Sequence, residues 1–133
     1  AEQTFVLESG RLIEADRENT FRGVIRVSDG EPILDTGNLS ISLPSSDPRY
    51  RRISIRPNEI IVSKHPLVSS ARNCMPGVIR EIRAKGKFIH LLVDAREPFL
   101  AAITARSYQE MDLHLFDKVY LSFKSTSITP LYD

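Results

Sequence analysis

The chain lacks several features that define common protein classes. It has 133 residues, no Trp and one cysteine, Cys74, so no disulfide can form within it. No apolar run approaches the roughly 20 residues of a membrane-spanning helix. The first residues show neither the basic nor the apolar part of a secretory signal. These absences favour a cytoplasmic, reducing location, and the missing initiator Met indicates a fragment or a processed chain.

Charge and motifs exclude further classes. The net charge of +1 gives no overall field that would attract a polyanion. No Walker motif is present, so this chain alone is not expected to hydrolyse ATP. His65, His90 and His114 are scattered, with no cysteine or carboxylate at metal-ligand spacing. No Ser-His-Asp arrangement or Gly-x-Ser-x-Gly motif is evident. We therefore predict a binding or regulatory domain, not an enzyme, without a free metal ion.

Short apolar runs between turn residues predict an all-β fold. A hairpin is expected around Ser9-Gly10, and one short helix over residues 105–111. Thr104 or Ser107 can cap this helix, and Ser107 with Glu110 has the spacing of a capping box. The strands that we predict in the rest of the chain are Phe21–Val27, Ile33–Leu34, Leu39–Leu43, Arg52–Arg56, Val78–Arg83, Phe88–Val93, Phe99–Thr104 and Val119–Phe123, and a new short element is expected to start over Glu59–Val62.

Two echoes in the sequence indicate an internal duplication. Gly23-Val24-Ile25-Arg26 recurs as Gly77-Val78-Ile79-Arg80. Ile53-Ser54-Ile55-Arg56 resembles Tyr120-Leu121-Ser122-Phe123-Lys124 in pattern, and the two echoes occur in the same order. We predict two small OB-like β-barrel units of the size at which such barrels form. The expected division is an N-terminal subdomain at 1–66 and a second subdomain at 67–133.

Three segments present hydroxyls, backbone amides or a cation, and none presents a carboxylate. They are Ser69–Asn73, the pair Thr104 and Ser107, and Lys124–Thr126. Neutral donors converging on one point suit a small anion with many oxygens, because they carry no charge that must be desolvated when the site is empty. Each segment also has an ordinary structural interpretation, as a turn, a helix cap and a solvated lysine respectively.

The same residues resemble the molybdate/tungstate-binding Mop (TOBE) family. The resemblance covers Ser69 to about Leu131 and rests on four motifs: Ser70-Ala71-Arg72-Asn73, Pro76-Gly77-Val78, Ile103-Thr104 with Ser107, and Phe123-Lys124-Ser125-Thr126-Ser127. It implies molybdate or tungstate as the ligand, bound by Ser70, Ala71, Arg72, Thr104, Ser107, Lys124 and Ser125. Members bind the oxyanion at subunit or repeat interfaces, so the resemblance also implies a homodimer with the site at its interface.

The first half is similar to a second group of proteins and narrows the functional prediction. Ile55–Ile60 is similar to the Ile-Arg-Pro-Glu-Asp motif of C-terminal regulatory domains in ABC transporter ATPases. Phe5–Glu14 looks like the hairpin that ends their nucleotide-binding domain. The resemblance implies an oxyanion sensor that mediates trans-inhibition of an importer. Its partners would be the ABC nucleotide-binding domain and the membrane permease, at the inner face of the cell membrane.

Two alternatives stay open at this point. One is a free-standing molybdate/tungstate storage protein of the molbindin type, which would share the site but not the transporter. The other is an OB-type binder of single-stranded nucleic acid. Arg49, Arg51, Arg52 and Arg56 lie around Tyr50, but stacking aromatics are few, and we expect no nucleic-acid partner. The first half lacks its own Ser-Ala-Arg-Asn segment, so no second site is expected there.

Overall fold

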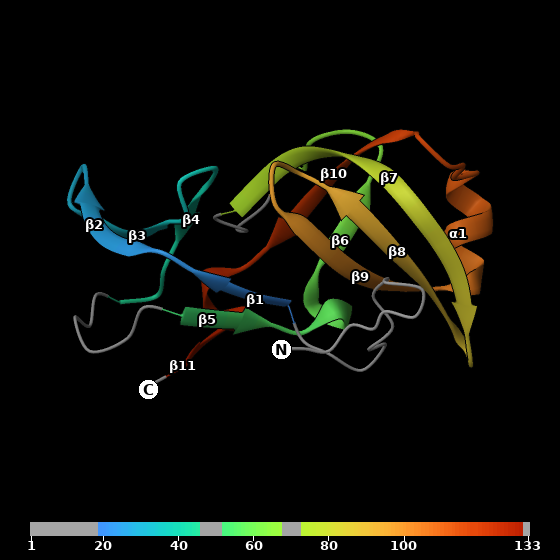
Figure 1. Cartoon of the computed structure of the whole chain (residues 1–133). Helices are drawn as coiled ribbons and strands as arrows, with labels where there is room; N and C mark the ends of the chain where they lie inside the picture. The colour runs from blue at the N-terminus through green and yellow to red at the C-terminus, as the bar shows by residue number, and fades with distance from the viewer. Residues whose placement is uncertain (1–18, 46–51, 68–72, 132–133) are drawn as a thin grey trace.

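The computed structural model describes residues 19–45, 52–67 and 73–131 (Figure 1). The predicted hairpin around Ser9-Gly10 lies outside these ranges. Within them the chain forms eleven strands, two 3₁₀ turns and one α-helix, which confirms the predicted all-β class with a short helix. The elements are β1 (Asn19–Arg22), β2 (Val24–Ser28), β3 (Glu31–Asp35), β4 (Ser40–Ser42), β5 (Arg52–Ile55), η1 (Pro57–Glu59), β6 (Ile61–Ser63), β7 (Asn73–Lys85), β8 (Phe88–Asp94), β9 (Pro98–Thr104), α1 (Ala105–Met111), β10 (Lys118–Phe123), η2 (Ser125–Ser127) and β11 (Ile128–Leu131).

The strands form three antiparallel sheets. Their orders are β1-β5-β11, β2-β3-β4 and β6-β10-β7-β8-β9. Figure 1 shows the β2-β3-β4 sheet at one end of the molecule and α1 at the other, with the five-stranded sheet curving between them. The curvature coincides with a register shift between Ile79 and Glu81 on β7, since a bulge bends its strand and increases the local twist.

The helix α1 has the range that the sequence predicts, but its cap differs in part. Thr104 is the N-cap residue, and its Oγ1 accepts from the backbone N of Ser107 at 3.0 Å. Ser107 therefore lies inside the first turn, and the predicted capping box with Glu110 is wrong. Glu110 instead pairs with Arg106 one turn earlier, at 3.0 Å between Nε and Oε2.

The predicted strand Phe21–Val27 is divided at Gly23. β1 before this glycine and β2 after it belong to different sheets. A Cβ atom at position 23 would lie 2.7 Å from the carbonyl carbon of Asp35 and 3.0 Å from the Cα of Thr36. Only a glycine permits this close backbone approach, and the alternation of side chains gave no sign of the division.

The first echo marks equivalent positions in two repeats, which we call the first repeat (residues 19–63) and the second repeat (residues 73–131). Val24 pairs with Asp35, and its counterpart Val78 pairs with Asp94. In each repeat the arginine two residues later forms an ion pair with that aspartate. The nitrogen–oxygen distances are 3.0 Å for Arg26 and 3.6 Å for Arg80.

The strands that follow the second echo in the chain are exchanged between the repeats. Each echoed strand, β5 or β10, is followed by one extended residue, a 3₁₀ turn and a short strand. The short strand then pairs with the other repeat: β6 pairs with β10, and β11 pairs with β5. Strands from both sides of the predicted boundary at residues 66 and 67 therefore share two sheets. The boundary itself stays a prediction.

One hydrophobic core runs through both repeats. Phe99 of the second repeat lies between Phe21 of the first and Phe123, with ring centroids 4.7 and 6.1 Å apart. Phe99 and Phe123 are fully buried, as are Ile53 and Ile55 of the first repeat. Because burial of such side chains contributes about 1.5–3 kcal/mol each, the shared core and the exchanged strands hold the repeats together.

Candidate functional site

Lys124 and Ser125 follow directly after β10. Phe123, the last residue of that strand, is buried and pairs with Asn73 at the start of β7. Lys124 is exposed and extended, and its carbonyl accepts from the N of Ser127 in the 3₁₀ turn. Among the described residues Lys124 forms no ion pair. Its ammonium is therefore available to an anion as a point charge on a flexible stem.

Another predicted segment, Ser70-Ala71-Arg72, ends in the sequence directly before Asn73, the strand partner of Phe123. Ser70, Ala71 and Arg72 fall outside the described residues, but Asn73 follows them directly and is buried. Asn73 bonds both backbone groups of Ser42 on β4: Oδ1 accepts from the N–H at 2.8 Å, and Nδ2 donates to the carbonyl at 3.2 Å. The chain is thus fixed at the point where the predicted anion segment ends.

Thr104 and Ser107 are brought together at the start of α1. Thr104 Oγ1 accepts from the backbone N of Ser107 and donates to Ser107 Oγ, both at 3.0 Å. Thr104 is exposed and Ser107 is half-buried. With Thr104 committed to the cap, the hydroxyl of Ser107 is the group that remains to donate to an outside acceptor.

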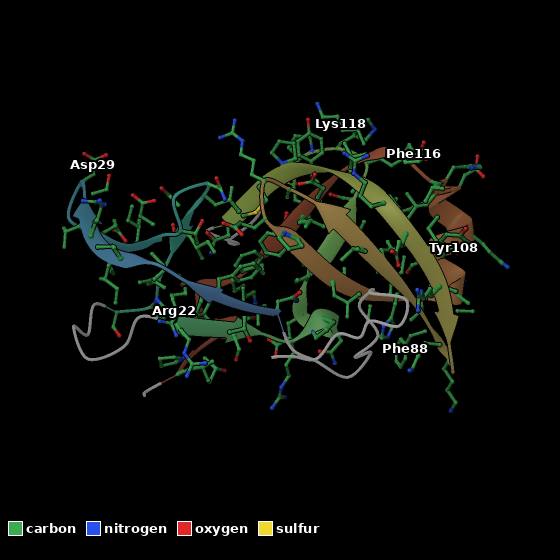
Figure 2. All side chains as sticks on the ribbon, viewed as in Figure 1. Arg22, Asp29, Phe88, Tyr108, Phe116 and Lys118 are labelled. Carbon is green, nitrogen blue, oxygen red and sulfur yellow. The ribbon has the colours of Figure 1, made fainter. Side chains whose placement is uncertain are left out.

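The structure does not bring the two pairs of donors together within one chain. Phe88 pairs with Thr104 on one side and with Lys85 on the other, so Thr104 lies level with the end of β7. Figure 2 shows Phe88 at the same end of the molecule as Tyr108 of α1. Lys124 lies beside Asn73, at the start of β7. These ends of the 13-residue strand are separated by about 40 Å of chain at 3.3 Å per residue.

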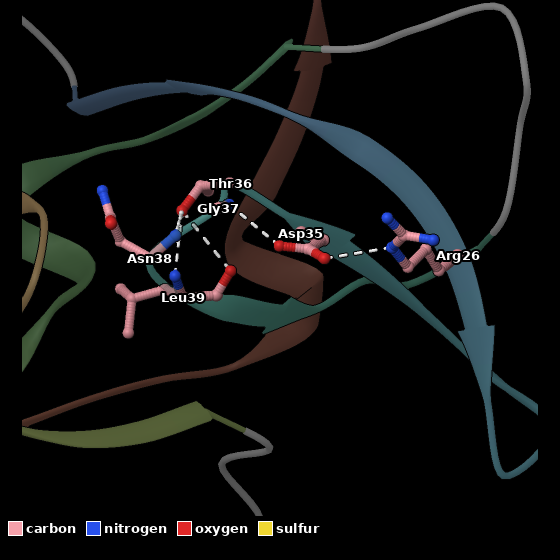
Figure 3. Close-up of polar contacts among 6 residues, drawn as sticks. All are labelled: Arg26, Asp35, Thr36, Gly37, Asn38 and Leu39. Carbon is pink, nitrogen blue, oxygen red and sulfur yellow. Dashed lines mark hydrogen bonds and ion pairs between the residues drawn. The ribbon is translucent and has the colours of Figure 1, made fainter.

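A polar cluster at the turn between β3 and β4 was not predicted from the sequence (Figure 3). Asp35 accepts from the N–H of Gly37 at 2.8 Å and from Arg26 Nε at 3.0 Å. These bonds, the backbone one first, hold the pKa of Asp35 below its usual value. The Asp-Thr-Gly-Asn pattern at residues 35–38 is typical of such side-chain-stabilised turns and could have indicated it.

The same turn contacts its counterpart in the second repeat. Thr36 Oγ1 donates to Glu97 Oε2 at 2.7 Å, and Asn38 Nδ2 donates to the same oxygen at 3.1 Å. Thr36 Oγ1 also accepts from the N–H groups of Asn38 and Leu39. The hydrogen-bonding groups of this cluster serve one another, so it joins the repeats and does not form a ligand site.

None of the predicted site residues lines either of two surface hollows. One of about 290 Å³ is lined in part by Arg80, Asp94 and Arg96. The other, of about 340 Å³, is lined in part by Tyr108 and His114 beside α1. In the part of the chain that the structure describes, no three His, Cys, Asp or Glu side chains gather as metal ligands would. None of the described helices has the length and apolar character to cross a bilayer.

The basic cluster considered for nucleic acid is only partly described. Arg49, Tyr50 and Arg51 lie outside the described residues. Arg52 is half-buried in β5, and Arg56 is exposed just beyond it. Arg56 occupies the position in the first repeat that Lys124 occupies in the second.

Comparisons with known proteins agree with the predicted resemblance. The TOBE domain family model matches residues 69–130. Over 112 residues the chain is 32% identical to the molybdate/tungstate import ATP-binding protein WtpC of Pyrococcus abyssi, and equally to that of Pyrococcus horikoshii. Each match covers 84% of this chain but 31% of the relative, so the chain spans about a third of the length of these relatives.

A solved structure shows the same fold. The cytoplasmic molybdate-binding protein ModG, in a crystal form with molybdate bound, matches with a TM-score of 0.71. The match covers 86% of this chain and 96% of that one at 12% sequence identity. At this identity the likeness concerns the fold alone, and it confirms the predicted OB-like architecture of the TOBE/Mop type.

Proposed function

We propose that this chain, whose residues 69–130 match the TOBE domain family model, binds molybdate or tungstate and reports its concentration to an ABC importer. One observation supports the proposal: Phe123, which directly precedes Lys124 and Ser125, pairs with Asn73, the residue that follows Ser70-Ala71-Arg72 in the sequence. Both sequence segments are among the three whose residue types suit a tetrahedral oxyanion. The anion would meet backbone amides, hydroxyls and one ammonium, and no carboxylate.

The proposed site needs a second copy of the chain. Lys124 and Ser125 follow the strand that pairs with the start of β7, and Ser70, Ala71 and Arg72 precede Asn73 in the sequence, whereas Thr104 and Ser107 lie at the far end of β7. We propose that a homodimer supplies all seven, with Thr104 and Ser107 of one copy facing the Lys124 corner of the other. Supporting this, Thr104 is exposed, and the half-buried Ser107 keeps a hydroxyl donor for an external acceptor.

The proposed role is regulatory and not catalytic. The relatives named WtpC are import ATP-binding proteins about three times as long as this chain. In a transporter of that kind the domain would lie in the cytoplasm beside a nucleotide-binding domain and a membrane permease. Accumulated anion, bound between two such domains, would hold the ATPase dimer in a non-transporting arrangement. Two copies joined by an anion provide the coupling free energy that such inhibition requires.

Calorimetric titration with molybdate, tungstate and sulfate tests the binding. We expect dissociation constants near the micromolar range, about −8 kcal/mol, for the two larger anions. Light scattering in the same buffers tests the dimer, whose formation should be favoured by the anion through mass action. If neither molybdate nor tungstate binds near micromolar concentration, the proposed function is wrong.

A free-standing storage protein is the second candidate, favoured by the 96% coverage of ModG. The two roles predict different rates of anion transport by an importer that contains this domain, measured in membrane vesicles. A sensor predicts that anion inside the vesicle inhibits transport, and that Lys124→Ala in this domain relieves the inhibition. A storage role predicts anion binding with no effect on transport.

A further inference from the structure

Asn73 holds the start of β7 against a strand of the other repeat. Its side chain is 4% exposed, and its carboxamide bonds both the N–H and the carbonyl of Ser42. Ser42 is the last residue of β4, at the edge of the β2-β3-β4 sheet. The first repeat, which has no Ser-Ala-Arg-Asn segment, is therefore in direct contact with the residue that ends this segment in the second repeat.

An asparagine in the first repeat makes the reciprocal contact. Asn19 lies four residues before Gly23, as Asn73 lies four residues before Gly77. Its Oδ1 accepts from the N–H of Leu100 at 2.6 Å, and its Nδ2 donates to the carbonyl of Leu100 at 2.9 Å. Asn19 is 8% exposed, and its Nδ2 also donates to the carbonyl of Ile55. The two clamps are alike in chemistry and burial, but only Asn73 stands beside the proposed anion site.

We propose that Asn73 is a positioning residue for the oxyanion site, acting through the backbone of β4; this inference rests on the proposed function. Asn73 pairs directly with Phe123, and Lys124 follows Phe123. Fixing Asn73 against Ser42 therefore fixes the start of β7 at the level where Lys124 leaves β10. Binding sites lose affinity when supporting contacts allow displacements of about 1 Å. The carboxamide of Asn73 fixes the start of β7 without contacting the anion.

The contact requires a carboxamide. One end of the side chain must accept a hydrogen bond while the other donates, within the reach of a single backbone residue. An apolar side chain would leave the outward backbone groups of Ser42 without a partner. An aspartate would place a carboxylate oxygen against the carbonyl of Ser42, where the asparagine presents its NH₂ group.

The matched variants Asn73→Ala and Asn19→Ala test the inference. Each removes one clamp, so urea denaturation should show similar losses of stability. Calorimetry with molybdate on the folded proteins should separate them. We expect Asn73→Ala to weaken anion binding about tenfold or more, the scale of one lost positioning contact. Asn19→Ala should bind within about twofold of wild type, because its clamp lies away from Lys124.

A second pair of variants breaks the same contacts from the other side. Ser42→Pro removes the N–H that donates to Asn73 Oδ1 and leaves Asn73 unchanged, and Leu100→Pro does the same to Asn19. Both positions are on edge strands, which tolerate proline best. Ser42→Pro should weaken molybdate binding, and Leu100→Pro should not.

The outcomes separate the inference from the function. Equal loss of affinity in both members of a pair would overturn the positioning role, because it would reflect general destabilisation. Unchanged affinity in Asn73→Ala would also overturn it. Both results leave the proposed function standing if wild-type protein binds molybdate. Absence of binding by the wild type would overturn both.

Discussion

The first and second repeats place a cation at the same point of the fold but surround it differently. Arg56 follows β5 and Lys124 follows β10, each in an extended conformation before a 3₁₀ turn. The first turn reads Pro57-Asn58-Glu59, whereas the second reads Ser125-Thr126-Ser127. Before the clamping asparagines the sequence reads Asp16-Arg17-Glu18 in one repeat and Ser70-Ala71-Arg72 in the other. Carboxylates thus replace hydroxyls and small residues in the first repeat.

The β-scaffold that the two repeats share therefore does not depend on the residues of the proposed anion site. Both repeats keep the glycine, the Arg–Asp ion pair, the asparagine clamp and the exchanged strand. Next to its cation and its asparagine in the sequence, the second repeat has hydroxyls where the first has carboxylates. Among the described residues, only the second repeat carries a helix, α1, between β9 and β10. Three predictions test this difference between the repeats.

The largest effect is expected at the paired glycines. In Gly23→Ala the new Cβ would meet backbone atoms of Asp35 and Thr36, which cannot move without disturbing β3. We expect a loss of about 3 kcal/mol in the free energy of unfolding, measured by urea denaturation.

Gly77→Ala is the matched control for this substitution. Its Cβ would first meet Cγ1 of Val93, at 2.6 Å, with the carbonyl oxygen of Asp94 at 3.0 Å. A side-chain methyl yields more readily than backbone, so the expected loss is about 1–2 kcal/mol. A larger loss at Gly77 than at Gly23 would show that the two glycines are not equivalent.

The next effect concerns the equivalent cations. Lys124→Ala should weaken binding of molybdate by about 1.5–3 kcal/mol, the scale of a charge-assisted hydrogen bond. Arg56→Ala should leave anion affinity unchanged, because Pro57-Asn58-Glu59 follows it where Ser125-Thr126-Ser127 follows Lys124. Calorimetry on both variants checks the contrast. An equal loss for Arg56→Ala would indicate a second anion site in the first repeat.

The smallest effect is a difference in acid stability at Asp35. Because the pKa of this carboxyl is lowered in the folded protein, its ionised form stabilises the fold above the unfolded value of 3.8. That contribution is lost as the pH falls through the lower folded pKa. Asp35→Asn should therefore be slightly less stable than wild type at pH 7 and should converge with it in strong acid. A difference in urea midpoint that is the same at pH 7 and pH 2.5 would contradict this.

Local patterns predicted the elements well, because their causes lie within a few residues. The helix over 105–111 follows from a cap at Thr104. The capping role predicted for Ser107 was wrong, because the side chain of Thr104, three residues earlier, accepts the hydrogen bond from the N–H of Ser107. Choosing between two caps at this spacing depends on where β9 ends, which is set by its pairing with β8.

The candidate site was predicted only as a set of residue types. The sequence identifies Lys124 and Ser125 as donors, but not that Phe123, which precedes them, pairs with Asn73. It also gives no sign that Thr104 lies at the far end of β7 from them. The contact of Asn73 with Ser42 escaped prediction because the two residues are 31 positions apart.

The sequence by itself determined the all-β class, the duplication and the neutral, hydroxyl-rich chemistry of the second half, because these depend on composition and short-range pattern. The tertiary structure was needed to show that Gly23 divides a strand, that β6 and β11 are exchanged between the repeats, and that Lys124 and Ser125 lie apart from Thr104 and Ser107. Packing of the shared core around Phe99 sets which distant strands pair, so a pattern of neighbouring residues in the sequence does not predict this pairing.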